Sequence, residues 1–555
     1  MSRSIHHPDP TKDLGLLTIV CRFLLVSLNV DAILEEVTIR QRRKKLEEMT
    51  QGNGLSDAYT ATLSRVKAQK GYKSKLGLKV LMWVLYSERP LRAEELRHAL
   101  GVEIGSVDLD QENVPALRTL VASCLGLVTV EQFSSTVRLV HFTLREHLLH
   151  DPTLFRSPHS AIAEVCLTYL NFGFVRDLSL TLYSASSIMP LLRYASVYWG
   201  VHTSRGMGEN VQSLALRLLD RFDEHISAQL LLLEDRDYPF LDQYYYGTRR
   251  TLGFTGLHGV AFLGIVEMVA PLLEMKEWDV NAADFMGSTA LTWAAIRGHD
   301  GVVKILSERA DLDPNQADTE YGRTPLSWAA GRGNEAVVKI LLEQEDVNPN
   351  QPDTEYGRAS LSWAVEKRHE GVVKMLLERE DVNPNQPDTE YGQTPLSWAA
   401  GRGQEGAVEI LLEQEDVNLN QPDTEYGRAV EQRHEGVVKM LLEREDVNPN
   451  QPDIMQGQTP LSWAAQNGHE GVVKMFLERE GVNPDQPDTF YGRTPLEWAA
   501  GWGNEGVVKI LSERKDVNPD QPDTFYGRTP LEWAVERRHE GVIKMLLERE
   551  DVNPN

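Results

Sequence analysis

Five histidines recur in the second half of the chain, and each is followed directly by an acidic residue. A histidine beside a carboxylate can ligate a metal ion or move a proton, so this pairing is the first candidate for chemistry. The five occupy one position of a repeated block, however, which favours a structural role at the start of a helix. The sequence therefore predicts no catalytic and no metal-binding role for His299, His369, His434, His469 and His539.

Other sequence signatures of chemistry are missing. The chain has no His-Glu-x-x-His motif, no Gly-x-Ser-x-Gly nucleophile elbow and no Gly-x-Gly-x-x-Gly turn that follows a strand. The segment Asp485–Asp488 offers too few oxygen ligands for a calcium loop. We therefore expect a protein that is not an enzyme and that holds no cofactor.

The cysteines and the apolar run near the N-terminus indicate the cellular compartment in which the protein is expected. Cys21, Cys124 and Cys166 are widely spaced and form no Cys-x-x-Cys pair, as is typical of a reducing environment. The apolar run Leu14–Leu28 is too short to cross a bilayer and is interrupted by Arg22. We expect a cytoplasmic protein that makes no membrane contact.

The recurring histidines lie in a block that opens with Asp-Thr-Glu-Tyr-Gly-Arg-Thr-Pro-Leu-Ser-Trp at Asp318. Its turn glycines are 35 residues apart, except for one step of 34 and one of 30. A period of about 33 residues with a Gly-x-Thr-Pro-Leu opening resembles the ankyrin repeat, whose helix pairs stack into a solenoid that binds partners. The glycines are Gly287, Gly322, Gly357, Gly392, Gly427, Gly457, Gly492 and Gly527, with a divergent Gly253 before them.

Each part of the block has a predicted structural role. Thr324 supplies an N-cap oxygen, and Pro325 takes the first helical position, where its missing N–H is not needed. The first helix around Trp328 is apolar on several sides, which suits a helix between neighbouring repeats. We expect Gly333 to end it in the left-handed conformation. A second helix follows over Val337–Leu342, and the polar link after it forms a hairpin.

The repeats alternate between two kinds, and one joint departs from both. In the second kind Arg368, Arg433 and Arg538 occupy the helix-ending glycine position, at a cost of about 1 kcal/mol each. The block at Gly357 lacks the capping Thr and the Pro, and the block at Gly427 lacks the Leu and Trp of the first helix. We predict a weak joint near residues 357–435, because such arrays depend on interfaces between neighbours.

The first half of the chain is predicted to contain a winged helix. Leu76–Tyr86 is a strongly apolar helix, Pro90 lies in the turn before the next helix, and a third helix is expected near Val114–Cys124. Residues 126–144 resemble two short strands around a polar turn, which completes the motif. The third helix offers the single cation Arg118, whereas phosphate contacts need several. We expect a structural winged helix that does not bind nucleic acid.

The charge of the chain is unevenly distributed. Residues 1–250 carry 29 Lys and Arg against 28 Asp and Glu, whereas residues 251–555 carry 28 against 54. The whole net charge of −25 therefore lies in the repeats, which repel nucleic acid and anionic lipid. We expect a protein partner whose surface is basic or neutral.

Tyr and Arg flank the turn glycine of most repeats, at the tip of the predicted hairpin. Both residue types are favoured in binding hot spots, so they are candidate contact residues. The alternative is that each Tyr only packs on the next hairpin. The last two repeats differ from the others, because Phe490 and Phe525 replace a glutamate while Glu497 and Glu532 replace a serine. The candidates are Tyr321, Arg323, Tyr356, Arg358, Tyr391, Tyr426, Tyr491, Arg493, Tyr526 and Arg528.

Four ordered strings of the first half resemble the region that follows the NTPase module in fungal NACHT-type NOD-like receptors, which are STAND signalling proteins. With the repeats, this resemblance covers nearly the whole chain. It implies a recognition array of a receptor in innate immunity or non-self recognition, and a winged helix that is sometimes labelled after GPI inositol deacylases. The strings are FLLVSLNVDAIL (23–34), LSDAYTATLSRV (55–66), KVLMWVLYSERPLRAEELRHAL (79–100) and VRLVHFTLREHLL (137–149).

The chain departs from that family in one respect. Such receptors act through a P-loop, Gly-x4-Gly-Lys-Ser/Thr, and the sequence contains none. We therefore expect a binder, decoy or regulator of full-length relatives. The alternative is a fragment of a nucleotide-driven STAND switch whose NTPase lies upstream, and a winged-helix regulator that associates with DNA is a second, less favoured alternative.

We expect a mainly α protein in four parts. The last repeat ends without a polar capping repeat, so its final helix is predicted to expose apolar side chains or to pair with another chain. Those side chains are Val542, Ile543, Leu546 and Leu547. The parts are a helical remnant (1–72), a winged-helix domain (73–150), a helical linker (151–250) and an ankyrin-repeat α-solenoid (251–555) of about nine repeats, one of them shortened near 427–456.

Overall fold

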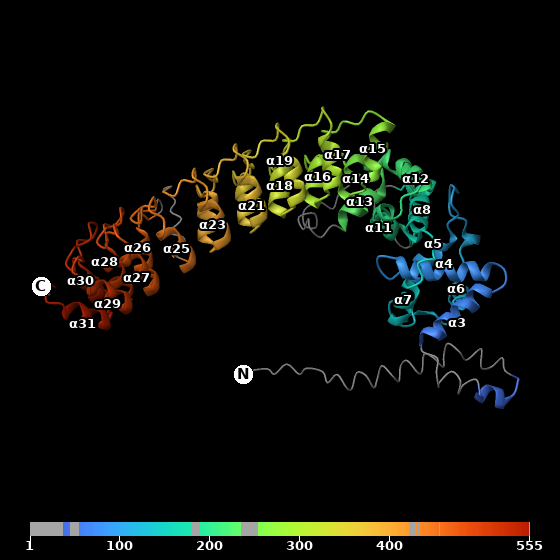
Figure 1. The fold of residues 1–555 in the computed structure, drawn as a ribbon, viewed down its shortest axis with the longest axis horizontal. Helices are drawn as coiled ribbons and strands as arrows, with labels where there is room; N and C mark the ends of the chain where they lie inside the picture. The colour runs from blue at the N-terminus through green and yellow to red at the C-terminus, as the bar shows by residue number, and fades with distance from the viewer. Residues whose placement is uncertain are drawn as a thin grey trace. The chain divides into compact units, whose positions relative to one another are not determined.

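The structure is a computed structural model with two compact units, residues 1–278 and 279–555. Both units are mainly helical (Figure 1), as predicted. None of the described helices is long and apolar enough to cross a membrane. The described residues are 37–44, 55–178, 189–234, 253–420, 429–430, 432–453 and 456–553.

The first unit begins with the winged helix that the sequence predicts. Strands β1 and β2 pair antiparallel with Val128 opposite Leu139, and a bridge from Arg92 to Thr136 ties this wing to the start of α5. Helices α4 and α6 approach closely, because a Cβ on Gly77 would lie 2.5 Å from the Ser123 carbonyl. The elements are α3 (Leu55–Ala68), α4 (Tyr72–Tyr86), α5 (Ala93–Gly101), η1 (Gln111–Asn113), α6 (Leu117–Ser123), β1 (Val128–Val130), β2 (Val137–Leu139) and α7 (Phe142–Leu149).

A helical region completes the first unit. Helix α8 packs on α11 and α12, and α14 packs on α12 so tightly that a Cβ on Gly256 would lie 2.3 Å from the Leu219 carbonyl. The pair α14–α15 thus groups with this region, and the predicted boundaries of the four parts stay predictions. The elements are α8 (Pro158–Leu170), α9 (Gly173–Arg176), α11 (Leu192–Arg205), α12 (Glu209–Leu219), η2 (Phe222–Glu224), α13 (Ile226–Leu233), α14 (Gly256–Leu263) and α15 (Val266–Met275).

The second unit is a solenoid of helix pairs. First helices pack on first helices and second helices on second helices along the row that Figure 1 shows. The first helices are α16 (Ala290–Arg297), α18 (Pro325–Arg332), α20 (Ser360–Glu366), α22 (Pro395–Gly401), α26 (Pro460–Asn467), α28 (Pro495–Trp502) and α30 (Pro530–Arg537). The second helices are α17 (Asp300–Ser307), α19 (Glu335–Leu342), α21 (Glu370–Leu377), α23 (Glu405–Leu412), α25 (Glu435–Leu442), α27 (Glu470–Glu478), α29 (Glu505–Ser512) and α31 (Glu540–Leu547).

The predicted helix ends are confirmed. Thr324 Oγ1 accepts a 3.1 Å hydrogen bond from the Ser327 backbone N–H, and Gly333 ends the first helix at a φ of 72°. Arg368, Arg433 and Arg538 take the left-handed conformation in its place, with φ of 65°, 62° and 63°. The predicted role of the five histidines at helix starts is confirmed as well, because each is the N-cap residue of a second helix.

At the shortened repeat the second helices follow one another without a break, because α25 packs on both α23 and α27. Between α22 and α26, the described residues at the first-helix position are Ala429 and Val430, both fully buried. Beside them, Asn420 Nδ2 donates to the Asp446 carbonyl at 2.8 Å, and the Asn448 N–H donates to Asn420 Oδ1 at 2.7 Å. The same two bonds link neighbouring full-length repeats, for example from Asn385.

Restoring the missing residues tests the predicted weak joint. Insertion of Thr-Pro-Leu-Ser-Trp between Arg428 and Ala429 gives the repeat a full first helix and places its Trp ten residues after Asp423, as in the other repeats. Burial of the new Leu and Trp should raise the free energy of unfolding by about 2–4 kcal/mol. Denaturant unfolding followed by circular dichroism measures this. An insertion of five Gly and Ser residues should not stabilise, and equal effects of the two insertions would refute the prediction.

Candidate partner-binding surface

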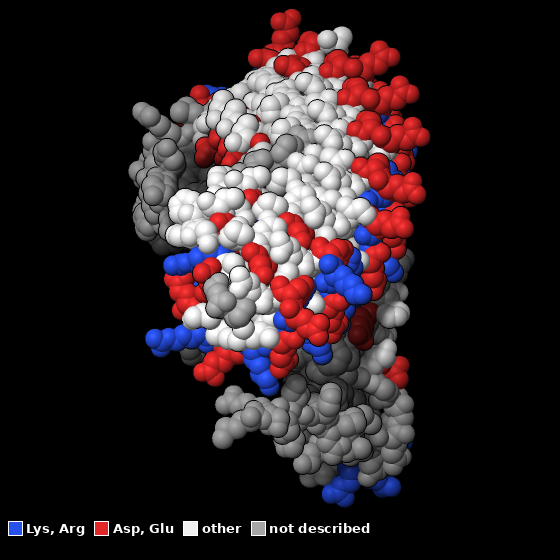
Figure 2. All heavy atoms as spheres, turned by 90° about the vertical axis from the view of Figure 1, so that its left-hand side faces the viewer, with Lys and Arg blue, Asp and Glu red and all other residues white. Residues whose placement is uncertain are grey.

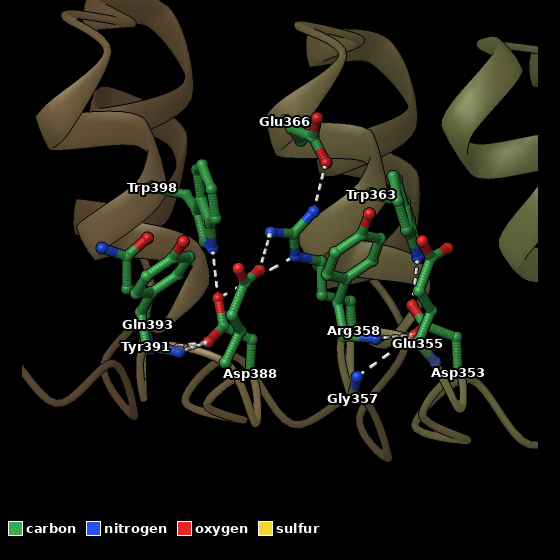
Figure 3. A network of polar contacts seen from close by, with 12 residues as sticks. Asp353, Glu355, Gly357, Arg358, Trp363, Glu366, Asp388, Tyr391, Gln393 and Trp398 are labelled. Carbon is green, nitrogen blue, oxygen red and sulfur yellow. Dashed lines mark hydrogen bonds and ion pairs between the residues drawn. The ribbon is translucent and has the colours of Figure 1, made fainter. Parts of the chain in front are cut away.

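An aspartate joins the hairpin of each described repeat to its first helix, and it is buried in all of these repeats except that of Asp453, which is half-buried. Asp353 Oδ2 accepts a 2.8 Å hydrogen bond from Trp363 Nε1 (Figure 3). Its other oxygen, Oδ1, accepts the backbone N–H groups of Glu355, Tyr356 and Gly357 at 3.0, 2.6 and 3.1 Å. The carboxylate is thus satisfied by four donors although the residue is only 4% exposed.

This Asp–Trp pair recurs along the array with Nε1-to-oxygen distances of 2.8–3.0 Å. Sequence reasoning assigned the Trp to the first helix but missed the Asp, although an acid stands nine or ten residues before every such Trp. The further pairs are Asp284–Trp293, Asp318–Trp328, Asp388–Trp398, Asp453–Trp463, Asp488–Trp498 and Asp523–Trp533.

Three candidate arginines lie between the tryptophans of successive repeats. The Arg358 guanidinium carbon is 5.2 Å from the Trp363 ring centre and 4.4 Å from that of Trp398 (Figure 3), and its side chain is 6% exposed. Arg323 and Arg493 bridge their own and the next Trp in the same way, the nearer ring being the next one at 3.3 and 3.9 Å. These cations therefore bind the neighbouring repeat.

The arginine of the last repeat stacks on its own tryptophan. The Arg528 guanidinium carbon is 4.8 Å from the Trp533 ring centre, and the side chain pairs with Glu536. Arg358 pairs with Glu366 in the corresponding way, at 2.7 Å. Arg528 is half-buried, so part of this cation faces solvent.

The turn glycine allows successive hairpins to approach each other. Gly322 has a φ of 70°, and a Cβ there would lie 2.5 Å from the Thr354 side chain. At this approach the Thr354 N–H donates to the Tyr321 carbonyl at 2.9 Å. The backbone of each such hairpin is thereby bonded to the next, for example from Thr389 to Tyr356 and from Thr524 to Tyr491.

The candidate tyrosines pack on the Trp of their own repeat and still reach solvent. Tyr321, Tyr356, Tyr491 and Tyr526 meet that ring edge-on, with centroids 5.5–6.2 Å apart. The carbonyl groups of Tyr321, Tyr356 and Tyr491 accept hydrogen bonds from the next hairpin, and the Tyr491 ring also contacts that hairpin through Phe525. The exposed fraction is 47% for Tyr391, 37% for Tyr491 and 51% for Tyr526, whereas Tyr426 lies outside the described residues. Their role as partner contacts stays a prediction.

Four aromatic side chains at the last two hairpins form an exposed group, which we call the aromatic tip cluster. Phe490 and Phe525 are 57% and 64% exposed, and they stand beside Tyr491 and Tyr526. The Phe525 ring lies 5.9 Å from Tyr491 and 4.7 Å from Tyr526, so the cluster spans both hairpins. Trp502, one turn after Trp498 on α28, is a further exposed aromatic residue, at 60%.

Exposed acids recur where each second helix ends, and we call them the acidic ridge. In Figure 2 acidic side chains form a row along one edge of the array. Arginines pair with only some of the ridge, as Arg379 does with Asp381 at 2.7 Å. The ridge consists of Glu343, Glu345, Asp346, Glu378, Glu380, Asp381, Glu413, Glu415, Asp416, Glu443, Glu445, Asp446, Glu478, Glu480, Glu513, Asp516, Glu548, Glu550 and Asp551.

Glu497 differs from the ridge acids because it is only 1% exposed. Its Oε2 accepts the Thr494 N–H at 2.6 Å in a capping box, while Oε1 has no hydrogen-bond partner. Burial raises the pKa of Glu497 to about 8, with a further rise from Asp523 that Arg493 opposes. Glu532, at the same position of the next repeat, is exposed.

The Asp–Trp clamp predicts a large stability effect from one substitution. Asp353→Ala leaves the Trp363 N–H and three backbone N–H groups without their acceptor, so the free energy of unfolding should fall by about 3 kcal/mol. Urea unfolding measures the loss. As a control, Asp381→Ala removes a carboxylate that is 53% exposed and pairs with Arg379, and it should cost less than about 1 kcal/mol. Similar losses for the two variants would show that the clamp contributes little.

Glu497 predicts a pH-dependent stability. Its pKa in the folded chain, about 8, lies above the ordinary value of 4.5, so the folded state retains a proton that the unfolded state releases. Stability from this group should fall as pH rises from 4.5 to 8.

Glu497→Ser, which installs the residue of the earlier repeats, should therefore stabilise increasingly over that range, by on the order of 2 kcal/mol at pH 8. Thermal melts at pH 5 and 8 compare it with Glu532→Ser, which should show no such trend. A constant difference between Glu497→Ser and the parent chain would contradict the assignment.

Comparison with known proteins agrees with this architecture. A model of ankyrin repeats matches residues 223–318, 310–388 and 426–523, and a single ankyrin repeat model matches 391–424 and 526–555. A model described as the GPI inositol-deacylase winged helix domain matches residues 64–163.

Among solved structures, the ankyrin repeat domain of Bcl-3, described as a unique member of the IkappaB protein family, is similar at 20% identity. The match covers 40% of this chain and 98% of that chain, with a TM-score of 0.36. The comparison with curated proteins gave no match. The chain thus carries a winged helix domain of the GPI inositol-deacylase type and an array of ankyrin repeats.

Proposed function

We propose that this chain is a non-enzymatic protein-binding module whose ankyrin array is the recognition surface. The observation that carries the proposal is the aromatic tip cluster. Large aromatic side chains that stay more than a third exposed are the residue types that supply binding energy in protein interfaces. Glutamate stands at the position of Phe490 and Phe525 in four earlier repeats, as Glu320, Glu355, Glu390 and Glu425, and the Phe-Tyr pair before the turn glycine occurs only in the last two hairpins.

The partner is a protein with an apolar anchor and a basic surround. The array has a net charge of −26, and the acidic ridge is only partly paired with arginines. Such a field attracts basic surfaces over a distance and speeds their association. An apolar side chain of the partner would be buried in the aromatic tip cluster, and basic side chains around it would contact the acidic ridge.

The same charge argues against nucleic acid and anionic membranes as partners. The candidate residues divide into two groups within this proposal. The exposed Tyr391, Tyr491 and Tyr526, with Arg528, contact the partner directly. The arginines between tryptophans, such as Arg358, hold the repeats in the right relative position.

We further propose a place for this module in the cytoplasm, as a recognition part related to fungal NACHT-type NOD-like receptors that act in innate immunity or non-self recognition. The resemblance of the first half to the region after their NTPase module supports this. The alternative is that the chain is a fragment of a nucleotide-driven STAND switch. The mass of the native protein and the 5′ end of its transcript separate the two.

Selection from a displayed peptide library on the immobilised chain tests the proposed recognition. Enriched peptides should place Lys and Arg around an apolar or aromatic core, and their affinity should fall with salt. Phe490→Glu combined with Phe525→Glu should weaken binding at least tenfold, as measured by fluorescence polarisation. The fold should be retained, because glutamate stands at this position in earlier repeats.

Phe285→Glu is the matched control, since Phe285 is an exposed hairpin aromatic outside the tip cluster and should not affect binding. Two outcomes would overturn the proposal. One is the enrichment of acidic peptides, and the other is equal affinity of the selected peptides for the double variant and the parent chain.

A further inference from the structure

Three metal-ligating side chains from distant parts of the chain converge in the first unit. Glu88 follows α4, His159 lies in the first turn of α8, and His202 lies in the last turn of α11. One ligand atom from each lies within 4.8 Å of the others. The two histidines face each other through Nδ1, at 2.9 Å.

Tyr194 supports His202 from the side of the ring that faces away from His159. The Tyr194 hydroxyl lies 2.9 Å from His202 Nε2 and forms a hydrogen bond with it. In the tautomer in which Nε2–H donates to this hydroxyl, the lone pair of neutral His202 is on Nδ1.

In that tautomer the Nδ1 lone pair of His202 points toward His159, whose Nδ1 is 2.9 Å away. An outer group that holds the far nitrogen of an imidazole in this way is the usual support of a metal-binding histidine. Tyr194 also accepts the Glu88 backbone N–H at 3.2 Å, so the same hydroxyl group positions the segment that carries the carboxylate.

The electrostatics keep both histidines in the neutral form that a metal requires. Burial lowers the pKa of His202 to about 3 and also lowers that of His159. The positive charge of Arg205 disfavours a metal cation at this site. Arg205 pairs with Glu88 Oε1 at 2.5 Å, however, and its side chain is half exposed, so solvent and the carboxylate reduce this repulsion. The second carboxylate oxygen, Oε2, remains for a ligand bond.

The donor set suits zinc and related ions. Two nitrogens bound at about 2.0–2.1 Å to a tetrahedral ion lie about 3.3 Å apart, so the 2.9 Å pair needs to open by only a few tenths of an ångström. Imidazole with carboxylate is a Zn²⁺ set, whereas Ca²⁺ and Mg²⁺ prefer oxygen ligands alone. Three protein ligands leave the fourth position to water.

We propose that Glu88, His159 and His202 form a Zn²⁺-class metal site that fastens the winged helix to the helical region after it. Glu88 follows α4 in the winged helix, His159 lies on α8 near the end of the matched winged helix range, and His202 lies on α11 beyond that range. A metal ion bound to all three would couple the two packing units, and its binding free energy would add to the stability of the first unit.

Metal titration of the full chain, produced without a histidine tag and stripped with a chelator, tests the site. One Zn²⁺ should bind per chain by calorimetry, Co²⁺ should give the visible absorption of a tetrahedral site, and Zn²⁺ should raise the melting temperature. His159→Gln and Glu88→Gln should each weaken Zn²⁺ binding at least tenfold. Tyr194→Phe, which removes only the hydroxyl, should weaken it 10- to 100-fold.

The control is His147→Gln, which removes a half-buried histidine that contacts Ser56 and Thr60 outside the cluster. Its affinity for Zn²⁺ should equal that of the parent. Circular dichroism of each variant without metal confirms that the fold is kept. A parent chain that binds no Zn²⁺, or variants at His159 and Glu88 that bind as tightly as the parent, would overturn the proposal.

Discussion

The buried aspartate that clamps each hairpin to its tryptophan is the interaction on which the array depends. A carboxylate in this position is costly to bury, and its four donors offset that cost only when hairpin and helix keep one geometry. Asp353 thereby fixes both the turn that carries Tyr356 and the plane of Trp363. Because the Trp plane is fixed, an arginine can stack between it and the next ring. The geometry of each hairpin therefore determines the distance between neighbouring repeats.

The clamp also draws cations between the repeats. Arg323, Arg358 and Arg493 are drawn between the repeats, where they face tryptophans and buried aspartates, as in the 3.9 Å approach of Arg358 to Asp388. These cations balance internal charge and are removed from the surface. The exposed acids at the ends of the second helices still outnumber the cations, because residues 251–555 hold 54 Asp and Glu against 28 Lys and Arg. A recognition surface that combines a negative electrostatic potential with exposed aromatic rings favours basic proteins over nucleic acid.

The sequence predicted what local rules control and missed what long-range packing decides. Thr324 and Gly333 act within one helix, so their types and spacing were sufficient to place them. Asp353 resembles an ordinary turn residue, and only the distance to Trp363 in the folded repeat reveals its role. The sequence could not predict the cluster of Glu88, His159 and His202. No motif links these positions, and only the packing of α4, α8 and α11 brings them together.

The shortened repeat shows which of the stacking interactions maintains continuity. Loss of five residues shortens the step to 30, yet the side chain of Asn420 still bridges to the next repeat, as its counterparts do elsewhere. The missing segment belongs to the first helix, so the second helices and the asparagine bridges beside them keep their neighbours. Since each repeat is stabilised by its nearest neighbours, such a defect stays local. The aromatic tip cluster is carried by the hairpins of α28 and α30, which pack on each other beyond the shortened repeat, so its geometry does not depend on that joint.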